Sequence, residues 1–319
     1  MSMGAAAGTT GYRALRERCA WMDLSDRGKL RATGDDRARL LHALTTQHVE
    51  QMKPGDGCYA FFLNAQGRIL GDANIFCRED SFLLDTEPET RQKLFEHIDR
   101  YIIADDVTLE DATGRMASIA IEGPEAAGVL EKLGAPAPAA ESAALDWRER
   151  IVARVSSTGA GGFCVFLPLD EKAELIGALK AAGIPEASPE EARIVRIEHG
   201  RPRYGEEITE RYLVQETGQL HAVHFSKGCY LGQEIVERVR SRAQIHRVLR
   251  RLEIAGADVP AAGAKLKAAD ASKDADAGEI ASAVFSPAFN KVAAMAYVRT
   301  PFAEPGTELR LGDALARVL

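Results

Sequence analysis

The sequence has no long apolar run and no signal peptide, and both absences limit where the protein works. A transmembrane helix needs about 20 consecutive apolar residues, and none of the runs in these 319 residues is that long. Residues 1–11 are small and polar, without the charged start and apolar core of a secretory signal. We therefore expect a cytoplasmic protein with no membrane partner.

Cysteine is scarce too. The five cysteines, at positions 19, 58, 77, 164 and 229, form no C-x-x-C pair. This spacing argues against a disulfide framework or a thiolate zinc site and fits a reducing compartment. The histidines show no metal-ligand spacing, so we predict no metal site and only structural or surface roles for His42, His48, His97, His221 and His224.

Excess positive charge is also missing. The formal net charge is −7, which argues against a general affinity for nucleic acid. Hydrophobic residues make up 46% and charged residues 27% of the chain, the balance of an ordinary globular protein. At this length the chain is expected to form two or three domains.

Short strands alternate with helices, and tight turns such as Asn64–Gly67 join neighbouring strands. Strands joined in this way are antiparallel, which favours an α+β fold over a doubly wound parallel sheet. We expect strands at 28–34, 58–63, 69–77, 81–85, 117–122, 151–155 and 163–167. We expect helices at 38–44, 89–101, 125–133 and 171–182.

The last part of the chain has a different pattern. Residues 255–278, rich in Ala, Asp, Lys and Gly, are predicted to be an excursion or linker. Proline and glycine then separate short strands, as expected of a small barrel or sandwich, and we assign residues 245–319 to an all-β domain.

The strongest chemical signal is the stretch from Lys227 to Glu234. Its two glycines indicate a loop that bends sharply or approaches another group closely. Cys229 lies in that bend, two residues after Lys227, and a nearby ammonium lowers the pKa of a thiol by stabilising the thiolate. The alternative is a small buried cysteine in a turn.

This stretch matches the signature Lys-Gly-Cys-Tyr-x-Gly-Gln-Glu of YgfZ-type proteins, folate-binding factors that help build or repair iron–sulfur enzymes. All seven specified positions match, namely Lys227, Gly228, Cys229, Tyr230, Gly232, Gln233 and Glu234. The resemblance implies a functional role for Cys229 at the rim of a cleft, with Lys227 beside it.

A wider and weaker resemblance, to the aminomethyltransferase (T-protein) superfamily, runs from about residue 12 to residue 319. It implies a multi-domain fold with antiparallel sheets and helices around a central cleft, followed by a C-terminal β-barrel. Residues 12–244 would form the folate-binding region, as two interleaved subdomains with about 53–114 inserted, and residues 245–319 the barrel.

Residues 193–205 resemble the superfamily stretch whose glutamate binds the pterin of tetrahydrofolate. The resemblance assigns this role to Glu198, with Arg193 and Tyr204 as further folate-binding residues. A carboxylate can accept two adjacent N–H groups of a pterin in a charge-strengthened pair of hydrogen bonds. The alternative is a helix carboxylate paired with Arg196 or Arg201.

Residues 64–72 resemble a turn and strand that end in Asp-Asp in the aminomethyltransferases, where one acid assists transfer to folate. Here the pair is Gly71-Asp72, so a single acid is left. Asp72 could act as a general base, or it could only satisfy backbone donors at a strand end.

A basic run follows the cysteine motif: Arg238, Arg240, Arg242, His246, Arg247, Arg250 and Arg251. Alternation at 238, 240 and 242 predicts three guanidiniums on one face of a strand. Guanidinium groups bind carboxylates in pairs of hydrogen bonds, so Arg240 is a candidate for the glutamate tail of folate. RNA, an acidic partner protein, or a plain solvated face are the alternatives.

The sequence therefore predicts a tetrahydrofolate-binding accessory protein, not itself an enzyme, that serves iron–sulfur client enzymes or assembly proteins through Cys229. The alternative is a folate-dependent aminomethyltransferase of the glycine cleavage type, which should carry an intact acid pair at residues 71 and 72. Because a cluster usually takes four cysteine ligands, Cys229 could not hold one alone.

Overall fold

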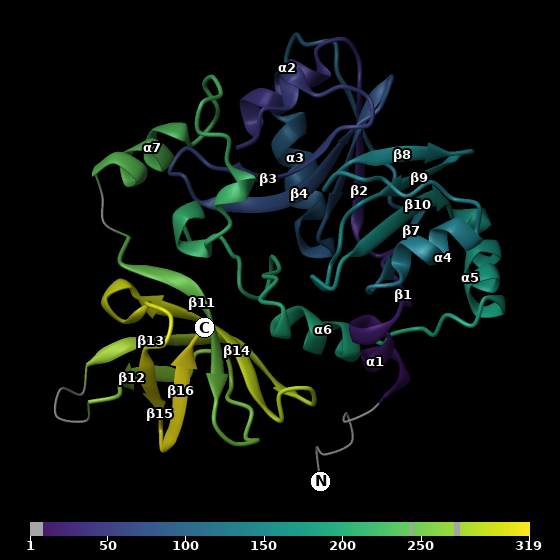
Figure 1. Ribbon diagram of the computed structural model, residues 1–319. Helices are drawn as coiled ribbons and strands as arrows, with labels where there is room; N and C mark the ends of the chain where they lie inside the picture. The colour runs from purple at the N-terminus through teal and green to yellow at the C-terminus, as the bar shows by residue number, and fades with distance from the viewer. Residues whose placement is uncertain (1–8, 243–244, 271–274) are drawn as a thin grey trace.

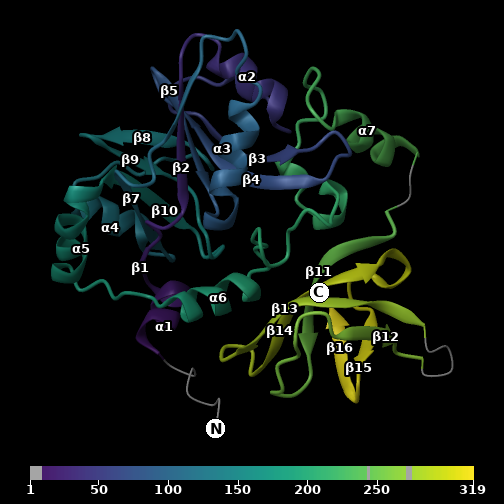
Figure 2. The same ribbon diagram turned by 180° about the vertical axis from the view of Figure 1, so that it is seen from behind.

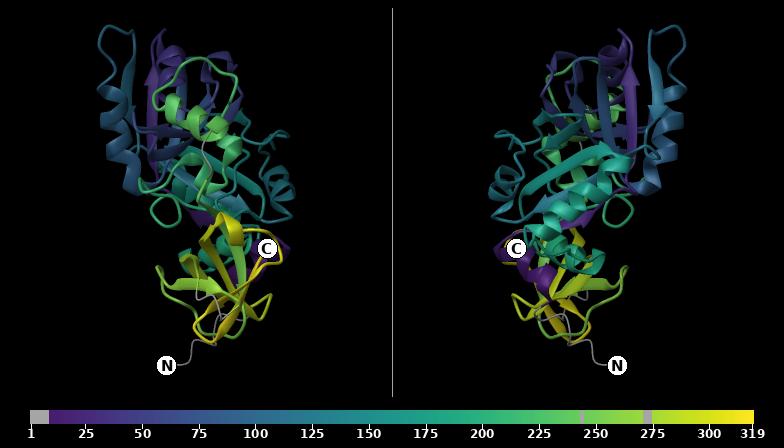
Figure 3. Two further views of the ribbon diagram at one scale, coloured as in Figure 1. Left: turned by 90° about the vertical axis from the view of Figure 1, so that its left-hand side faces the viewer. Right: turned by 90° about the vertical axis from the view of Figure 1, so that its right-hand side faces the viewer.

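The computed structural model describes residues 9–242, 245–270 and 275–319. Two antiparallel sheets lie side by side at one end of an elongated molecule, and a closed β-barrel forms the other end (Figure 1, Figure 3). All the strand pairs within the named sheets are antiparallel. The predicted α+β fold with a C-terminal barrel is confirmed.

The first sheet is contiguous in the chain. In the order β3-β4-β5-β2-β6, its strands are β3 (Gly57–Leu63), β4 (Ile69–Cys77), β5 (Ser81–Thr86), β2 (Gly28–Thr33) and β6 (Thr108–Asp111). Helices α2 (Arg37–Leu44) and α3 (Arg91–Asp99) pack their apolar sides on it, with Phe62, Ile75 and Leu94 at the centre of the core. This sheet therefore begins at residue 28 and not near 53, because β2 pairs with β5 and β6.

The second sheet combines one strand that precedes the first sheet in the sequence with four strands that follow it. Its order is β1 (Ala20–Asp23), β7 (Met116–Glu122), β10 (Gly162–Pro168), β9 (Arg150–Ala153) and β8 (Ala144–Trp147). Helices α4 (Ala126–Lys132) and α5 (Lys172–Ala181) belong to this half (Figure 2). Because β1 precedes the first sheet and pairs with β7 after it, the two halves are interleaved.

Helix α6 (Pro189–Glu198) links the sheets to the barrel. Ser188 accepts a hydrogen bond from the backbone N–H of Glu191, whose carboxylate accepts one from the backbone N–H of Ser188. This capping box, with proline at the first helical position, fixes where the helix begins. Helix α6 packs against α1 (Thr10–Glu17) and against barrel strands β13 and β14.

The barrel closes in the order β11-β14-β13-β12-β15-β16. Its strands are β11 (Arg247–Ile254), β12 (Lys265–Ala268), β13 (Asp276–Ser286), β14 (Lys291–Arg299), β15 (Glu308–Leu311) and β16 (Ala314–Val318). The prediction that 255–278 is only a linker is thus wrong for β12 and for the start of β13. Residues 271–274 of that segment lie outside the described residues.

Short 3₁₀ helices complete the described elements: η1 (Val49–Gln51), η2 (Pro88–Thr90), η3 (Leu169–Glu171), η4 (Val214–Thr217), η5 (Leu220–Ala222) and η6 (Thr300–Phe302). No helix in the described part of the chain is long and apolar enough to cross a membrane.

Helix α7 (Gln233–Arg242) overturns one prediction. The arginines from 238 onward were expected on a strand, where alternate residues share a face. In a helix, residues two apart point in nearly opposite directions, so Arg238 and Arg240 do not form a stripe. The apolar residues Ile235, Val236 and Val239 have helical spacing, and Val236 is buried against the first sheet's hairpin region.

Candidate functional site

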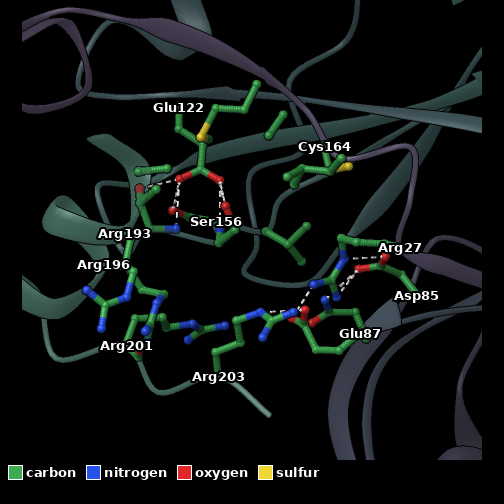
Figure 4. A pocket seen from close by; sticks show the side chains of 18 of the residues that line it. Arg27, Asp85, Glu87, Glu122, Ser156, Cys164, Arg193, Arg196, Arg201 and Arg203 are labelled. Atoms are coloured by element: carbon green, nitrogen blue, oxygen red, sulfur yellow. Dashed lines mark hydrogen bonds and ion pairs between the residues drawn. The ribbon is translucent and has the colours of Figure 1, made fainter. Parts of the chain in front are cut away.

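A cavity of about 560 Å³ lies between the two sheets and helix α6. Its walls come from the β1–β2 connection, β3, β4, the end of β5, β7, the loop 155–158, α6 and residues 201–203. A volume of this size is typical of small-molecule sites. In Figure 4, Arg193 and Arg196 lie on the left of the view, Arg201 and Arg203 lie below them, and the Arg27–Asp85–Glu87 group lies to the right.

Asp72 is a buried acid of this cavity. It lies on β4, and the hydroxyl of Tyr59 on β3 donates a 2.6 Å hydrogen bond to its Oδ2. Burial, followed by the negative charge of Glu87, raises the pKa of Asp72 to about 6. No hydrogen bond reaches Oδ1 from the residues that the structure describes, so this oxygen has an acceptor site that the described chain does not use.

Gly71, next to Asp72, faces the other side of the sheet. Consecutive strand residues point to opposite faces. A Cβ on Gly71 would lie 3.0 Å from the nearest methyl carbon of Leu94, in the core between β4 and α3. An acid at position 71 would therefore face that core, and of these two positions it is 72 that lines the cavity.

Four cavity arginines are bound to carboxylates. Arg27 donates to both oxygens of Asp85, at 2.8 and 3.0 Å, and also pairs with Glu87. Arg203 bonds Glu87 at 2.9 Å and Glu89 at 2.8 Å.

On helix α6, Arg193 pairs with Glu206, and Arg196 pairs with Glu206 and with Glu207 at 2.8 Å. These pairs neutralise most of the positive charge in the cavity wall.

Arg201 is different. Its guanidinium carbon lies 5.8 Å from the ring centroid of Tyr59, and it forms no ion pair with any described residue. Tyr59 therefore contacts both Asp72 and Arg201: its hydroxyl donates a hydrogen bond to the carboxylate of Asp72, and the guanidinium of Arg201 lies over its ring.

Glu122, which none of the sequence motifs indicated, is fully buried at the end of β7. Its oxygens accept five hydrogen bonds, from the side chains of Ser156, Ser157 and Thr158 and from the backbone N–H groups of the last two. Because these donors occupy both oxygens, Glu122 shapes the loop that lines the cavity instead of offering a free acceptor. The run Ser156-Ser157-Thr158 is the only signal of it in the sequence.

Glu198 does not line the cavity. It lies on α6 two residues after Arg196, which is nearly the opposite side of the helix. Tyr12 donates a 2.6 Å hydrogen bond to its carboxylate, and Arg16 and Ser286 also bind it. These contacts tie α1, α6 and the barrel together, so the position of Glu198 does not support the pterin contact predicted for it.

The other predicted folate ligands are scattered. Arg193 lines the cavity. Tyr204 is buried outside the cavity lining, with its hydroxyl 3.4 Å from the carbonyl of Ile69. Arg240 is exposed on α7 and lies over the ring of Phe225, at 4.4 Å, so it is also outside the cavity.

Sequence comparison places the chain in a family. The GCVT N-terminal domain profile matches residues 5–227, and that of the glycine cleavage T-protein C-terminal barrel domain matches residues 247–315. The chain belongs to the glycine cleavage T-protein family.

Relatives of this T-protein family chain include an aminomethyltransferase of Rubrobacter xylanophilus, 30% identical over 95% of this chain and 82% of the relative. A putative chloroplastic transferase of Arabidopsis thaliana is 30% identical over 68% of this chain, a match that spans only 52% of that protein. The crystal structure of aminomethyltransferase T from Bartonella henselae has a TM-score of 0.87 at 21% identity, covering 97% of this chain and 87% of that one. That likeness shows the shared fold.

In this T-protein family chain, the motif from Lys227 to Glu234 lies apart from the cavity. The ammonium of Lys227 donates to the carbonyls of His42, Thr45 and Gln47, at 2.5, 2.7 and 2.7 Å. It therefore binds the chain at the C-terminal end of α2. Burial lowers the pKa of Lys227 to about 7, although three carbonyl acceptors favour the charged form. The ammonium of Lys227 is thus engaged by these backbone carbonyls, and no contact between it and Cys229 is found among the described residues.

Cys229 itself is exposed, whereas the other cysteines are buried or half-buried. The motif glycine Gly232 has a φ of +85°, and a Cβ there would lie 2.7 Å from the carbonyl oxygen of Asn64. Its role is thus the close docking of the motif on the β3–β4 turn.

The remaining motif positions support this loop. Tyr230 is buried in the same cluster as Val236, Gln233 accepts a 3.3 Å hydrogen bond from the backbone N–H of Tyr230, and Glu234 is exposed in the first turn of α7. Gly228 lies next to His42.

Three histidines pack together beside the motif. The rings of His42 and His48 are 4.6 Å apart, and those of His48 and His224 are 5.2 Å apart. Among the described residues, no group of three or more metal-ligating side chains could hold a metal ion.

Proposed function

We propose that the cavity binds a reduced folate and that the protein transfers a one-carbon unit to it, with Asp72 as the acid–base group. The observation that carries this proposal is Asp72 itself, a buried cavity carboxylate with one free oxygen and a pKa of about 6. A group that titrates near the working pH is well suited to proton transfer.

The cavity residues fit a folate. Asp72 Oδ1 can accept a hydrogen bond from an N–H of a tetrahydropterin, and the volume is that of a cofactor site. When bound, tetrahydrofolate would supply two amine nitrogens that both bond to the methylene carbon of an aminomethylated carrier thiol, while ammonia and the thiol leave with the two N–H protons. Asp72, mostly ionised at neutral pH, would take up one of these protons and pass it to a leaving group.

The family membership supports this reading, because matched relatives carry the name aminomethyltransferase. The replacement of the first acid by Gly71 does not oppose it, since that side chain would face Leu94 and not the cavity.

The test is a transfer assay with purified protein. Wild type should release methylenetetrahydrofolate from an aminomethylated lipoyl carrier protein, and Asp72→Asn should lose about two to four orders of magnitude in rate, the contribution of one general base. Arg240→Gln, on the surface of α7, is the control and should stay active. Turnover by Asp72→Asn at the wild-type rate would refute the assignment.

A second candidate is the accessory role in iron–sulfur enzyme assembly or repair. The exposed thiol of Cys229, within the complete YgfZ-type motif, favours it. Because Cys229 lies outside the cavity, the two candidates can be separated by mutation. In cells, Cys229→Ser should lower the activity of iron–sulfur enzymes if the accessory role holds, while Asp72→Asn should do so only if folate chemistry is part of that role.

A further inference from the structure

Tyr59 is the residue that contacts the carboxylate of the cavity acid. Among the described residues, its hydroxyl is the sole side-chain donor to Asp72, at 2.6 Å. Phe61 of β3 lies opposite Asp72 of β4. Tyr59, two residues before Phe61, is therefore the diagonal neighbour of Asp72 on the same face of the sheet. The register of the β3–β4 hairpin thus brings the donor to the acid.

The ring of Tyr59 is held from several sides. It stacks on His221, with centroids 5.7 Å apart, and packs edge-to-face on Phe61 at 5.5 Å, while Arg201 lies over it. Burial, followed by the charge of Asp72, raises the pKa of Tyr59 well above its ordinary value of 10. The hydroxyl therefore stays protonated and remains a donor to Asp72 at neutral pH.

We infer that Tyr59 is a positioning residue for Asp72: its hydrogen bond favours the ionised carboxylate and fixes Oδ2, which leaves Oδ1 to exchange a proton. The inference rests on the proposed function, in which Asp72 must be ionised to take up a proton. A hydrogen bond to a charged acceptor is stronger than one to a neutral acceptor. The bond from Tyr59 therefore stabilises the carboxylate more than the protonated acid.

The other charges that act on Asp72 do not depend on Tyr59. Burial, followed by the charges of Glu87 and Asp85, raises the pKa of Asp72, and the charge of Arg27 lowers it. Arg27 is paired with both of these acids. Because those ion pairs do not involve the hydroxyl of Tyr59, a variant that lacks only this hydroxyl keeps them.

The remaining titratable neighbours keep one charge state while Asp72 titrates. Partial burial, followed by the charge of Arg201, lowers the pKa of His221 below its ordinary value of 6.5, which favours the neutral ring. Burial raises the pKa of Tyr204, so its hydroxyl stays neutral. Arg201 is charged at every pH of interest.

The experiment measures the transfer rate of wild type and of Tyr59→Phe from pH 5 to pH 9. Phenylalanine keeps the ring but cannot donate to the carboxylate, so the acid limb of the profile should move up by about one pH unit. Since Asp72 titrates near pH 6 in wild type, the variant should be about five-fold slower at pH 6 and within about 10% of wild type at pH 9. A merely structural role of Tyr59 would lower the rate by the same factor at every pH, and that result would overturn the inference.

Tyr297→Phe is the matched control. It removes another buried tyrosine hydroxyl, one that donates a 2.9 Å hydrogen bond to the carbonyl of Glu207, and Tyr297 lies outside the cavity lining. This variant should keep the pH profile of wild type. An equal displacement of its acid limb would show that the limb responds to a general loss of stability, and would also overturn the inference.

A second measurement does not depend on transfer activity. Carbon-13 NMR of protein labelled at the aspartate carboxyls follows Asp72 directly, and its signal is identified by its absence from Asp72→Asn. The midpoint should rise from about 6 in wild type to about 7 in Tyr59→Phe, and an unchanged midpoint would refute the role of Tyr59. If wild type shows no transfer at any pH, the proposed function fails, while the NMR midpoint still decides whether Tyr59 favours the ionised form of Asp72.

Discussion

The replacement Asp72→Asn should stabilise the protein while removing its activity, and the effect should depend on pH. The carboxyl of Asp72 has its pKa raised from 3.8 to about 6 by burial. Between these pH values the folded protein keeps a proton that the unfolded chain has lost. Wild-type stability therefore falls as pH rises from about 4 to about 6.

The size of the effect follows from the same shift. At about 1.4 kcal/mol per pH unit, the loss amounts to about 3 kcal/mol by pH 7. Asparagine cannot ionise, yet its carbonyl can still accept the hydrogen bond from Tyr59. The variant should then exceed wild type in stability by about 2.4 kcal/mol more at pH 7 than at pH 4, because the unfolded chain has already begun to ionise at pH 4.

Urea unfolding of both proteins at pH 4, 5, 6 and 7, followed by circular dichroism, measures this difference. Subtracting wild type from variant cancels the other titrating groups, which the two proteins share. A difference that stays constant over this range would refute the reasoning, because it would show that Asp72 has the same pKa in the folded and unfolded chain.

Further predictions concern the motif and the interdomain contacts. Gly232→Ala should destabilise the protein by roughly 1–3 kcal/mol in urea unfolding, because the new Cβ would clash with its neighbours at a residue that must keep a positive φ. Gly128→Ala is the control: a Cβ there meets only open space on helix α4, so this variant should stabilise the protein by about 0.5–1 kcal/mol. Lys227→Met should cost roughly 1–3 kcal/mol by leaving buried carbonyls unpaired, and the rate at which a thiol reagent modifies Cys229 in the folded variant should not change. Glu198→Gln should lower the free energy of unfolding by about 1–3 kcal/mol, because the contacts with Tyr12 and Arg16 are weakened. Its tetrahydrofolate affinity, measured by calorimetry, should not change. A large loss of affinity would show that Glu198 binds the folate after all.

Much of the fold could be predicted because its signals are local. Alternating residues and tight turns such as Asn64–Gly67 identified the antiparallel strands, and proline and glycine indicated the barrel. The errors arose where two local patterns compete. Arginines at alternate positions resemble a strand face, but the apolar spacing of Ile235, Val236 and Val239 made residues 233–242 a helix.

The sequence by itself determined the antiparallel architecture, the family resemblance and the choice of Asp72 and Cys229 as residues of interest, because each depends on residue types at short spacing. Only the tertiary structure decided that Glu198 turns to α1 and the barrel, and that Lys227 binds the end of α2. It also decided which arginines of the cavity are neutralised. Tyr59 and Arg201 are far apart in the chain, so the contact between them depends on how α6 and the sheets pack, and that packing is set by the whole core.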